Sequence, residues 1–262
     1  SISQVIESTL SMARSFQVED KIKIITSLQE EDLSSFDILT NTGFNRPINK
    51  EIIDQLSAKC VIPLMWEPWE FRPNELDIDA CASKGIYVYG TDESDPRLGT
   101  MQYIGYTVLL FLLENKRTPF SSNILIVGDN HFGKAIGNTL KQNKYNYYWI
   151  CDYSGSIDLT LYDVIVFAEH QKETLLIGKG GFLEGSDIDS ETLLIHIAGK
   201  VDFSTINCMK IPLKPAMFGQ MSFTADFIDN IAVIDLHTAG LKVAEGMIEA
   251  NLLNLKGLEY RR

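Results

Sequence analysis

A histidine near the C-terminus is the residue of this chain best suited to proton transfer. His237 follows the apolar stretch Ile231–Asp235, which is typical of a strand, so it would stand where a strand leads into a helix. An imidazole there can donate a proton near neutral pH, as the reduction of a carbonyl group requires. A histidine at such a junction can equally cap backbone groups, and both interpretations of His237 stay open.

A glycine-rich turn is the second feature whose residues could take part in binding or catalysis. Gly128 ends an apolar run, and a helical pattern begins by Gly133, with Asn130, His131 and Phe132 between them. Strand, turn and helix in this order form a dinucleotide-binding unit, in which the helix N-terminus offers N–H groups to a pyrophosphate. The first and third fingerprint glycines are present, whereas Asn130 stands where the second normally lets the phosphate approach.

Asp152 ends the next expected strand, residues 147–152. An acid at this distance from the glycines accepts hydrogen bonds from an adenosine ribose, and it favours NAD over NADP because a 2′-phosphate would meet like charge. Asp is also an ordinary residue of strand-end turns. NAD is the expected cofactor, and the turn residues and Asp152 are its candidate ligands.

Two N-terminal loops carry charges suited to a small ligand. Arg46 closes the loop 41–46, and Glu67 and Arg72 lie in the loop 66–72 beside two tryptophans. Loops after parallel strands face the cleft in which such folds bind ligands. Charges among aromatic residues suggest a pocket for an amine or zwitterion, although the aromatic rings can also simply anchor the loop to the core. These three charged residues are the candidate substrate-binding residues.

The composition argues against several classes of function. The chain has 262 residues, 45% of them hydrophobic, and 23 basic against 35 acidic residues give a net charge of −12. Such a surface disfavours nucleic acid and anionic membranes. No apolar run is long enough to cross a bilayer, and the 4 cysteines lack the paired spacing of a zinc site. We expect a cytoplasmic protein with a small-molecule substrate, free thiols and no metal.

Strands and helices alternate along most of the chain, which predicts an α/β fold with parallel sheets covered on both faces. Strands are expected over residues 21–25, 36–40, 60–65, 86–89, 124–128, 147–152, 163–167, 192–197 and 231–235. Helices are expected over residues 2–15, 49–58, 76–84, 98–114 and 242–255, and directly after the glycine-rich turn.

The order of these parts resembles that of the D-isomer-specific 2-hydroxyacid dehydrogenases. Residues 77–88 are similar to that family's passage D-x-D-A-A-x-x-x-G-I-x-V, and the long helix and glycine-rich turn follow in the same order. Residues 195–202 look like a degraded N-x-A-R-G-x-x-V-D strand end, and residues 236–240 resemble the motif P-H-I-A-G.

The resemblance implies two Rossmann-like domains around a cofactor cleft. Residues 1–95 would form the substrate (flavodoxin-like) domain, residues 96–241 the dinucleotide-binding domain, and the helix 242–262 would return to the first domain. His237 would be the acid/base residue, and the strand end at Ala198 would border the cofactor. Members of the family are usually dimers, so a homodimer is an expected partner arrangement.

The chain also departs from the family pattern. The family's carboxylate-binding arginine should follow Ala198, but the nearest cation is Lys200, one position late, and lysine is a point charge rather than a bidentate fork. Lys200 is therefore the candidate carboxylate anchor. No residue matches the glutamate that polarises the histidine, and Asp235 and Glu245 are candidates on spacing alone. Residues 214–224 could form a lid.

Three functions stay open. The preferred one is an NAD(P)-dependent oxidoreductase of a small 2-oxo or 2-hydroxy acid, or a related amino or imino acid, in a specialised biosynthetic pathway. The others are a non-dehydrogenase enzyme that uses bound NAD, and an inactive dinucleotide-binding regulatory protein. Asn130 and the missing arginine and glutamate favour these two, whereas Gly128, Gly133, Asp152 and His237 together favour an enzyme.

Overall fold

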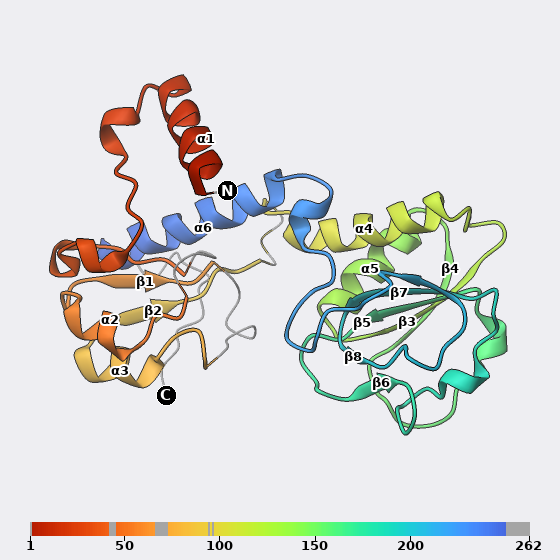
Figure 1. Cartoon of the computed structure of the whole chain (residues 1–262). Coiled ribbons are helices and arrows are strands. Elements are labelled where there is room, and N and C mark those ends of the chain that lie inside the picture. Colours follow the sequence, from red (N-terminus) through yellow and green to blue (C-terminus); the bar gives the residue numbers. More distant parts are fainter. Residues whose placement is uncertain (1, 42–45, 66–72, 94, 96, 250–262) are drawn as a thin grey trace.

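The structure of the chain is a computed structural model that describes residues 2–41, 46–65, 73–93, 95 and 97–249. Figure 1 shows two α/β halves joined by an extended segment and by the last helix. The N-terminal half contains a two-stranded sheet, and the C-terminal half contains a five-stranded sheet with a second two-stranded sheet beside it. The sheets are parallel, as the sequence predicts, and the α/β fold class is confirmed.

The sheet of the N-terminal half is short. It consists of β1 (Val61–Pro63) and β2 (Tyr87–Tyr89), and Ile38 adds a single parallel bridge to Val61. The predicted strand over residues 36–40 is therefore reduced to one bridge. The predicted strand over residues 21–25 is wrong, because these residues pair with no other strand among those described.

Two short helices cover this sheet, and side-chain caps fix where they begin. The helix α2 (Lys50–Gln55) starts after Asn49, and α3 (Ile78–Lys84) starts after Asp77. Each cap accepts a hydrogen bond from a backbone N–H in the first turn, at 3.1 Å for Asn49 and 2.9 Å for Asp77. Such caps stabilise a helix by about 1 kcal/mol. The first helix, α1 (Ile2–Ser15), has the predicted bounds and projects from the N-terminal half (Figure 1).

The five-stranded sheet of the C-terminal half has the order β4-β3-β5-β7-β9. Its strands are β3 (Asn123–Gly128), β4 (Asn146–Ile150), β5 (Val164–Ala168), β7 (Leu193–Ala198) and β9 (Met209–Ile211). The chain passes from β3 outward to β4 and then back across β3 to β5, so the strand order reverses there. The carboxyl ends of β3 and β5 mark the switch point at which open α/β sheets bind ligands.

The two faces of this sheet are covered differently. The helices α4 (Thr100–Glu114) and α5 (Phe132–Gln142) pack together on one face. The opposite face is covered by β6 (Leu175–Ile177), β8 (Lys200–Val201) and irregular segments, whose apolar side chains bury Leu125 and other residues of the sheet. This sheet is thus covered on both faces, as the sequence predicts, by helices on one face and by β6, β8 and irregular segments on the other.

The last described helix corrects the strand predicted over residues 231–235. These residues begin α6 (Ile231–Ile248), which contains His237 and the first part of the predicted helix 242–255. Its buried residues Gly240, Val243, Ala244 and Met247 repeat with the helical period, whereas an apolar run of four residues cannot by itself distinguish strand from helix. The helix packs on β1 and so returns to the N-terminal half, as predicted (Figure 1). The predicted domain boundary at residue 241 falls inside it.

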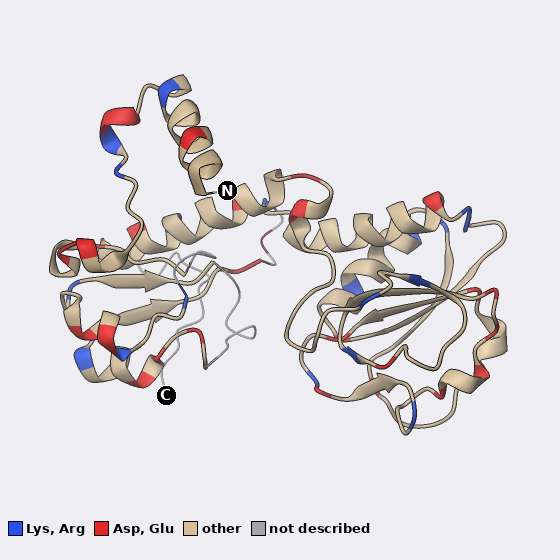
Figure 2. Cartoon of the chain, in the orientation of Figure 1, with Lys and Arg blue, Asp and Glu red and all other residues tan. Residues whose placement is uncertain are grey.

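The acidic character of the chain extends over the whole molecule. In Figure 2 acidic residues are spread over both halves and along the segment that joins them, in keeping with the net charge of −12. Within the described residues, no helix is both long enough and apolar enough to cross a membrane.

Candidate functional site

A cavity of about 480 Å³ lies between the two halves of the molecule. Met65 and Glu93, which follow β1 and β2, form one side of it, and Phe132 at the start of α5 belongs to the other. The cavity therefore lies at the carboxyl edge of the first sheet, where the loops of an α/β fold bind ligands. The polar residues that line it are Arg46, Glu93, Thr100, Gln220, Thr224 and His237.

Arg46 and His237 were predicted from the sequence on separate grounds, and the structure brings them to the same cavity. The Nε of Arg46 donates to the carbonyl oxygen of Asn41 at 3.1 Å, and an Nη donates to Glu75 Oε2 at 3.2 Å. These two bonds fix the direction of the guanidinium. A guanidinium held in this way is suited to a carboxylate, because its N–H groups match two carboxylate oxygens. The predicted residues Glu67 and Arg72 lie outside the described residues.

Thr100 and Glu93 are functional candidates that the sequence analysis missed. The side chain of Thr100 is 4% exposed, and its hydroxyl has no hydrogen-bond partner within the described part of the chain. Leaving such a group without a partner costs about 1–3 kcal/mol, which a polar ligand in the cavity would offset. Glu93 is a buried carboxylate that follows β2. The rule that ligands bind at carboxyl ends of strands could have found it.

The carboxylates proposed from spacing as partners of His237 do not face it. His237 lies within α6, so Asp235, two residues earlier, points to another face of the helix. Glu245 lies two turns further along and pairs with Lys242 at 2.6 Å. Both candidates rested on spacing alone, and within α6 this spacing does not direct either carboxylate to His237. The carboxylate that lines the same cavity as His237 is Glu93.

Lys200, the predicted carboxylate anchor, lies elsewhere. It is the first residue of β8, which pairs with β6, and its Nζ contacts Glu173 Oε1 at 2.9 Å near the surface. Lys200 is not among the residues that line the cavity, so the structure does not bring it to His237. Among the described residues that line the cavity, Arg46 is the cation that could hold a carboxylate.

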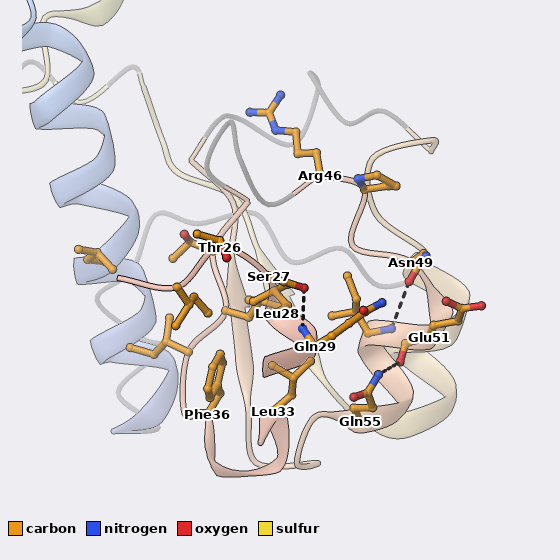
Figure 3. Close-up of a pocket in the computed structure, with 17 residues that line it drawn as sticks. Thr26, Ser27, Leu28, Gln29, Leu33, Phe36, Arg46, Asn49, Glu51 and Gln55 are labelled. Carbon is orange, nitrogen blue, oxygen red and sulfur yellow. Dashed lines mark hydrogen bonds between the residues drawn. The ribbon is translucent and has the colours of Figure 1, made fainter. Parts of the chain in front are cut away.

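A second cavity, of about 690 Å³, lies between the N-terminal segment 25–40 and the helix α2 with the residues before it (Figure 3). Its polar side chains serve the local backbone: Ser27 and Asn49 accept bonds from the short helices that follow them, and Gln55 donates to the carbonyl of Glu51 at 2.9 Å. Arg46 stands at the rim, with its guanidinium directed away from these residues (Figure 3). We therefore place the functional site in the cavity between the halves.

The two glycines of the predicted dinucleotide turn are both required by packing. A Cβ on Gly128 would lie 2.6 Å from the carbonyl oxygen of Ala168 on β5. A Cβ on Gly133 would lie 2.4 Å from the indole Nε1 of Trp149, which donates to the carbonyl of Gly128 at 3.0 Å. No larger residue fits either position, whether or not a ligand binds. The glycines alone are therefore weaker support for a cofactor than the sequence suggested.

The side chain of Asp129 occupies the centre of this turn. Its Oδ1 accepts the backbone N–H groups of His131 and Phe132, both at 2.7 Å, and its Oδ2 accepts that of His170 at 2.8 Å. The residue is 3% exposed. Burial raises the pKa of its carboxyl even though the three N–H groups oppose that shift. The sequence analysis did not single out Asp129.

Comparison with known proteins was made by sequence and by structure. No protein-family model matches the sequence, and no curated protein is significantly similar to it. A D-lactate dehydrogenase from Treponema pallidum is 11% identical, with a TM-score of 0.56 over 87% of this chain and 88% of that one. A D-lactate dehydrogenase with NAD+ from Lactobacillus jensenii is 12% identical, with a TM-score of 0.54 over 93% of this chain and 94% of that one. A D-2-hydroxyisocaproate dehydrogenase is 9% identical, with a TM-score of 0.54 over 86% and 87%.

The chain has the fold of the D-isomer-specific 2-hydroxyacid dehydrogenases. The resemblance that the motifs indicate is thus confirmed at the level of the fold. In this 2-hydroxyacid dehydrogenase fold, the N–H groups at the start of the helix after the glycine-rich turn are the natural anion site. Here that site corresponds to the amides of His131 and Phe132, which Asp129 already binds. A pyrophosphate at this turn would compete with Asp129 for these amides.

The remaining predicted cofactor residues lie around the same edge of the dehydrogenase fold. Asp152 is exposed after β4, and its carboxylate accepts a bond from the Ser154 hydroxyl at 3.0 Å. Asn130 is exposed in the turn, and Ala198 is buried at the end of β7. Their contacts with a cofactor, including the ribose role of Asp152, stay predictions.

A second buried carboxylate stands at this edge. Glu169 follows β5 and is fully buried, and its Oε1 accepts the backbone N–H groups of Gln171 and Lys172 at 2.7 and 2.8 Å. The Tyr153 hydroxyl donates to its other oxygen. The pKa of Tyr153 is raised, mainly by burial and in second place by this bond to a carboxylate. The switch point thus carries two buried acids whose oxygens are bound to the chain itself.

Residues 214–224, predicted as a lid, are held against the end of β7. The backbone N–H of Ser222 donates to the carbonyl of Ile197 at 2.8 Å, and Met221 forms an antiparallel bridge with Ala198. Gln220 of this segment lines the cavity. The segment therefore forms a fixed wall of the site in this structure.

His196 connects this segment to β7 and predicts a pH dependence of stability. Its ring is buried, with Nε2 at 2.9 Å from the carbonyl oxygen of Gly199 and Nδ1 at 2.7 Å from the Ser222 hydroxyl. Ser222 Oγ already accepts the N–H of Ala216, so its hydrogen points to Nδ1 and the proton of the neutral ring lies on Nε2. Burial lowers the pKa of His196.

The lowered pKa means that the unfolded chain takes up a proton before the folded chain does. The free energy of unfolding should therefore be constant above about pH 6.5 and fall below it, by at most about 1.4 kcal/mol per pH unit from this group. We expect the variant His196→Gln to be less stable at pH 7.5 but to lose less stability between pH 6.5 and 5. Urea unfolding at several pH values gives the slope of the free energy of unfolding against pH for the native chain and for the variant. Equal slopes below pH 6.5 would contradict a lowered pKa of His196.

Proposed function

We propose that the chain is an oxidoreductase of a small 2-oxo or 2-hydroxy acid, or of a related amino or imino acid, with a nicotinamide dinucleotide as redox partner. The observation that carries this proposal is the convergence of Arg46, Glu93 and His237 on one cavity between the halves. The fold supports it, because two of its solved examples are D-lactate dehydrogenases and one of these was solved with NAD+.

The residues of the cavity suit each part of such a substrate. Arg46 would hold the carboxylate, since a guanidinium binds both of its oxygens. His237 would give a proton to the substrate oxygen when the carbonyl is reduced, or take one from the hydroxyl in the opposite direction. Glu93 would stabilise the protonated imidazole, and the Thr100 hydroxyl would bond a polar substrate atom. A cavity of about 480 Å³ is within the range of small-molecule sites.

The cofactor would lie along the carboxyl edge of the second sheet. A nicotinamide supplies or accepts the hydride in this class of reaction. The amides of His131 and Phe132 would hold the pyrophosphate once Asp129 has left them, and Asp152 would bind the ribose. The charge of Asp152 favours NAD over NADP. The expected specialised biosynthetic role is part of the same proposal.

One observation favours a second candidate function. The carboxylate of Asp129 satisfies the amides that a dinucleotide would need, and it does so inside the protein. This arrangement suits a protein that binds a small acid in the cavity and regulates a partner without turnover. Such a protein would not need Asp129 to release the amides.

Titration of the protein with NADH and NADPH, followed by a screen of 2-oxo acids with and without ammonia, tests these two candidates. The oxidoreductase predicts tighter binding of NADH than of NADPH and cofactor oxidation with at least one oxo acid. Binding of an oxo acid, measured by calorimetry, without binding of either dinucleotide would overturn it in favour of the second candidate.

A further inference from the structure

The buried carboxylate of Asp129 lies where the fold would otherwise receive an anion. It follows the last residue of β3, and its Oδ1 lies 2.7 Å from each of the two amide nitrogens at the start of α5. The helix has 11 residues, so the positive end of its dipole adds to the attraction for negative charge at this point. The chain therefore provides its own anion for the site.

The surroundings reinforce this arrangement. The second oxygen of Asp129 accepts the N–H of His170, so the carboxylate bridges the turn after β3 and the turn after β5. Glu169 lies next to that N–H in sequence and is itself buried. A pyrophosphate at this edge would have to displace one carboxylate and approach another. Like charges at short range in a buried site disfavour each other strongly.

We propose that Asp129 is a specificity-determining residue that occupies the pyrophosphate site from within, so that an adenine dinucleotide binds only when the Asp129 side chain leaves the amides of His131 and Phe132. This inference rests on the proposed function. It means that the native chain binds dinucleotides weakly, and that a ligand without phosphate, such as a small oxo acid in the cavity, is unaffected by Asp129.

The variant Asp129→Gly tests the inference, because glycine removes the carboxylate and leaves the most room for a ligand at this position. We expect it to bind NADH at least about tenfold more tightly than the native chain in a calorimetric or fluorescence titration, equivalent to about 1.4 kcal/mol. Asp129→Asn keeps the shape without the charge and should show a smaller gain. If the glycine variant does not fold, Asp129→Asn provides the test instead.

Asp77→Gly is the matched control. Asp77 caps α3 in the N-terminal half through a bond to the N–H of Ala80 at 2.9 Å, so its loss removes an equivalent helix cap away from the site. This variant should lose stability and keep the dinucleotide affinity of the native chain. Hydrogen exchange of the His131 and Phe132 amides gives a second readout: it should be slow in the native chain and faster in Asp129→Gly without NADH.

The outcomes separate the inference from the proposed function. Equal NADH affinity in the native chain and both Asp129 variants would overturn the inference and leave the oxidoreductase intact. No NADH or NADPH binding by any folded variant would overturn both, because Asp129 would then not be the obstacle. Weak but measurable NADH binding by the native chain, with tighter binding by the Asp129 variants, supports both.

Discussion

Replacing Arg46 with alanine should weaken the binding of a small 2-oxo acid by roughly 30- to 1,000-fold, or about 2–4 kcal/mol. Arg46 is the cation that lines the cavity together with His237, and its bonds to Asn41 and Glu75 hold the guanidinium in place. Without it, no lysine or arginine among the described residues that line the cavity would bind the substrate carboxylate. Calorimetric titration with pyruvate measures the loss.

Two further variants make this test specific. Arg46→Lys keeps the charge but not the fork, and should recover only part of the affinity. Lys200→Ala removes the cation that the sequence predicted for this role, and should leave the affinity unchanged because Lys200 pairs with Glu173 outside the cavity. A larger loss from Lys200→Ala than from Arg46→Ala would show that the sequence-based assignment is right and the structural one wrong.

Replacing His237 with alanine should lower turnover by about 10²- to 10⁴-fold, the range typical of a lost general acid or base. His237 lines the cavity from α6 and is the histidine predicted for proton transfer. Binding of the oxo acid should change little, because Arg46 rather than His237 holds the carboxylate. Steady-state kinetics should therefore show a loss in kcat with a nearly constant KM.

The matched control for His237 is its neighbour Thr238. Its exposed hydroxyl donates to the carbonyl of Ile234 within the same helix at 2.8 Å, so Thr238→Ala tests for a general disturbance of α6. It should retain native turnover. Full turnover in His237→Ala, with the protein folded, would remove the acid/base role of this histidine.

The local pattern of the sequence predicts much of the fold. The strands β3, β5 and β7 are continuous apolar runs, as strands buried on both faces must be, and their bounds were predicted to within about two residues. The helices α1 and α4 were located by their apolar pattern, and α3 by the glycine that ends it. Hydrophobic period and capping residues act over a few positions, so sequence alone contains this information.

Errors arose where the local pattern was ambiguous. The run from residue 231 to 235 fits a strand or a buried helix equally well, and in the structure it is the first part of α6, whose later residues Val243, Ala244 and Met247 pack against β1. Because of that error, His237 was expected at a strand–helix junction and not within a helix, and its expected neighbours, such as Asp235, were wrong. The local pattern also does not show that β6, β8 and irregular segments bury the second face of the large sheet.

The sequence by itself determined the strand–turn–helix at Gly128, the parallel α/β class, and Arg46 and His237 as candidates. The tertiary structure decided which of these residues meet. It placed Arg46, Glu93 and His237 around one cavity, placed Lys200 outside that cavity, and put the carboxylate of Asp129 on the amides of the turn. These contacts join residues up to about 190 positions apart or depend on the direction of one side chain, and neither hydrophobic period nor motif spacing encodes such directions.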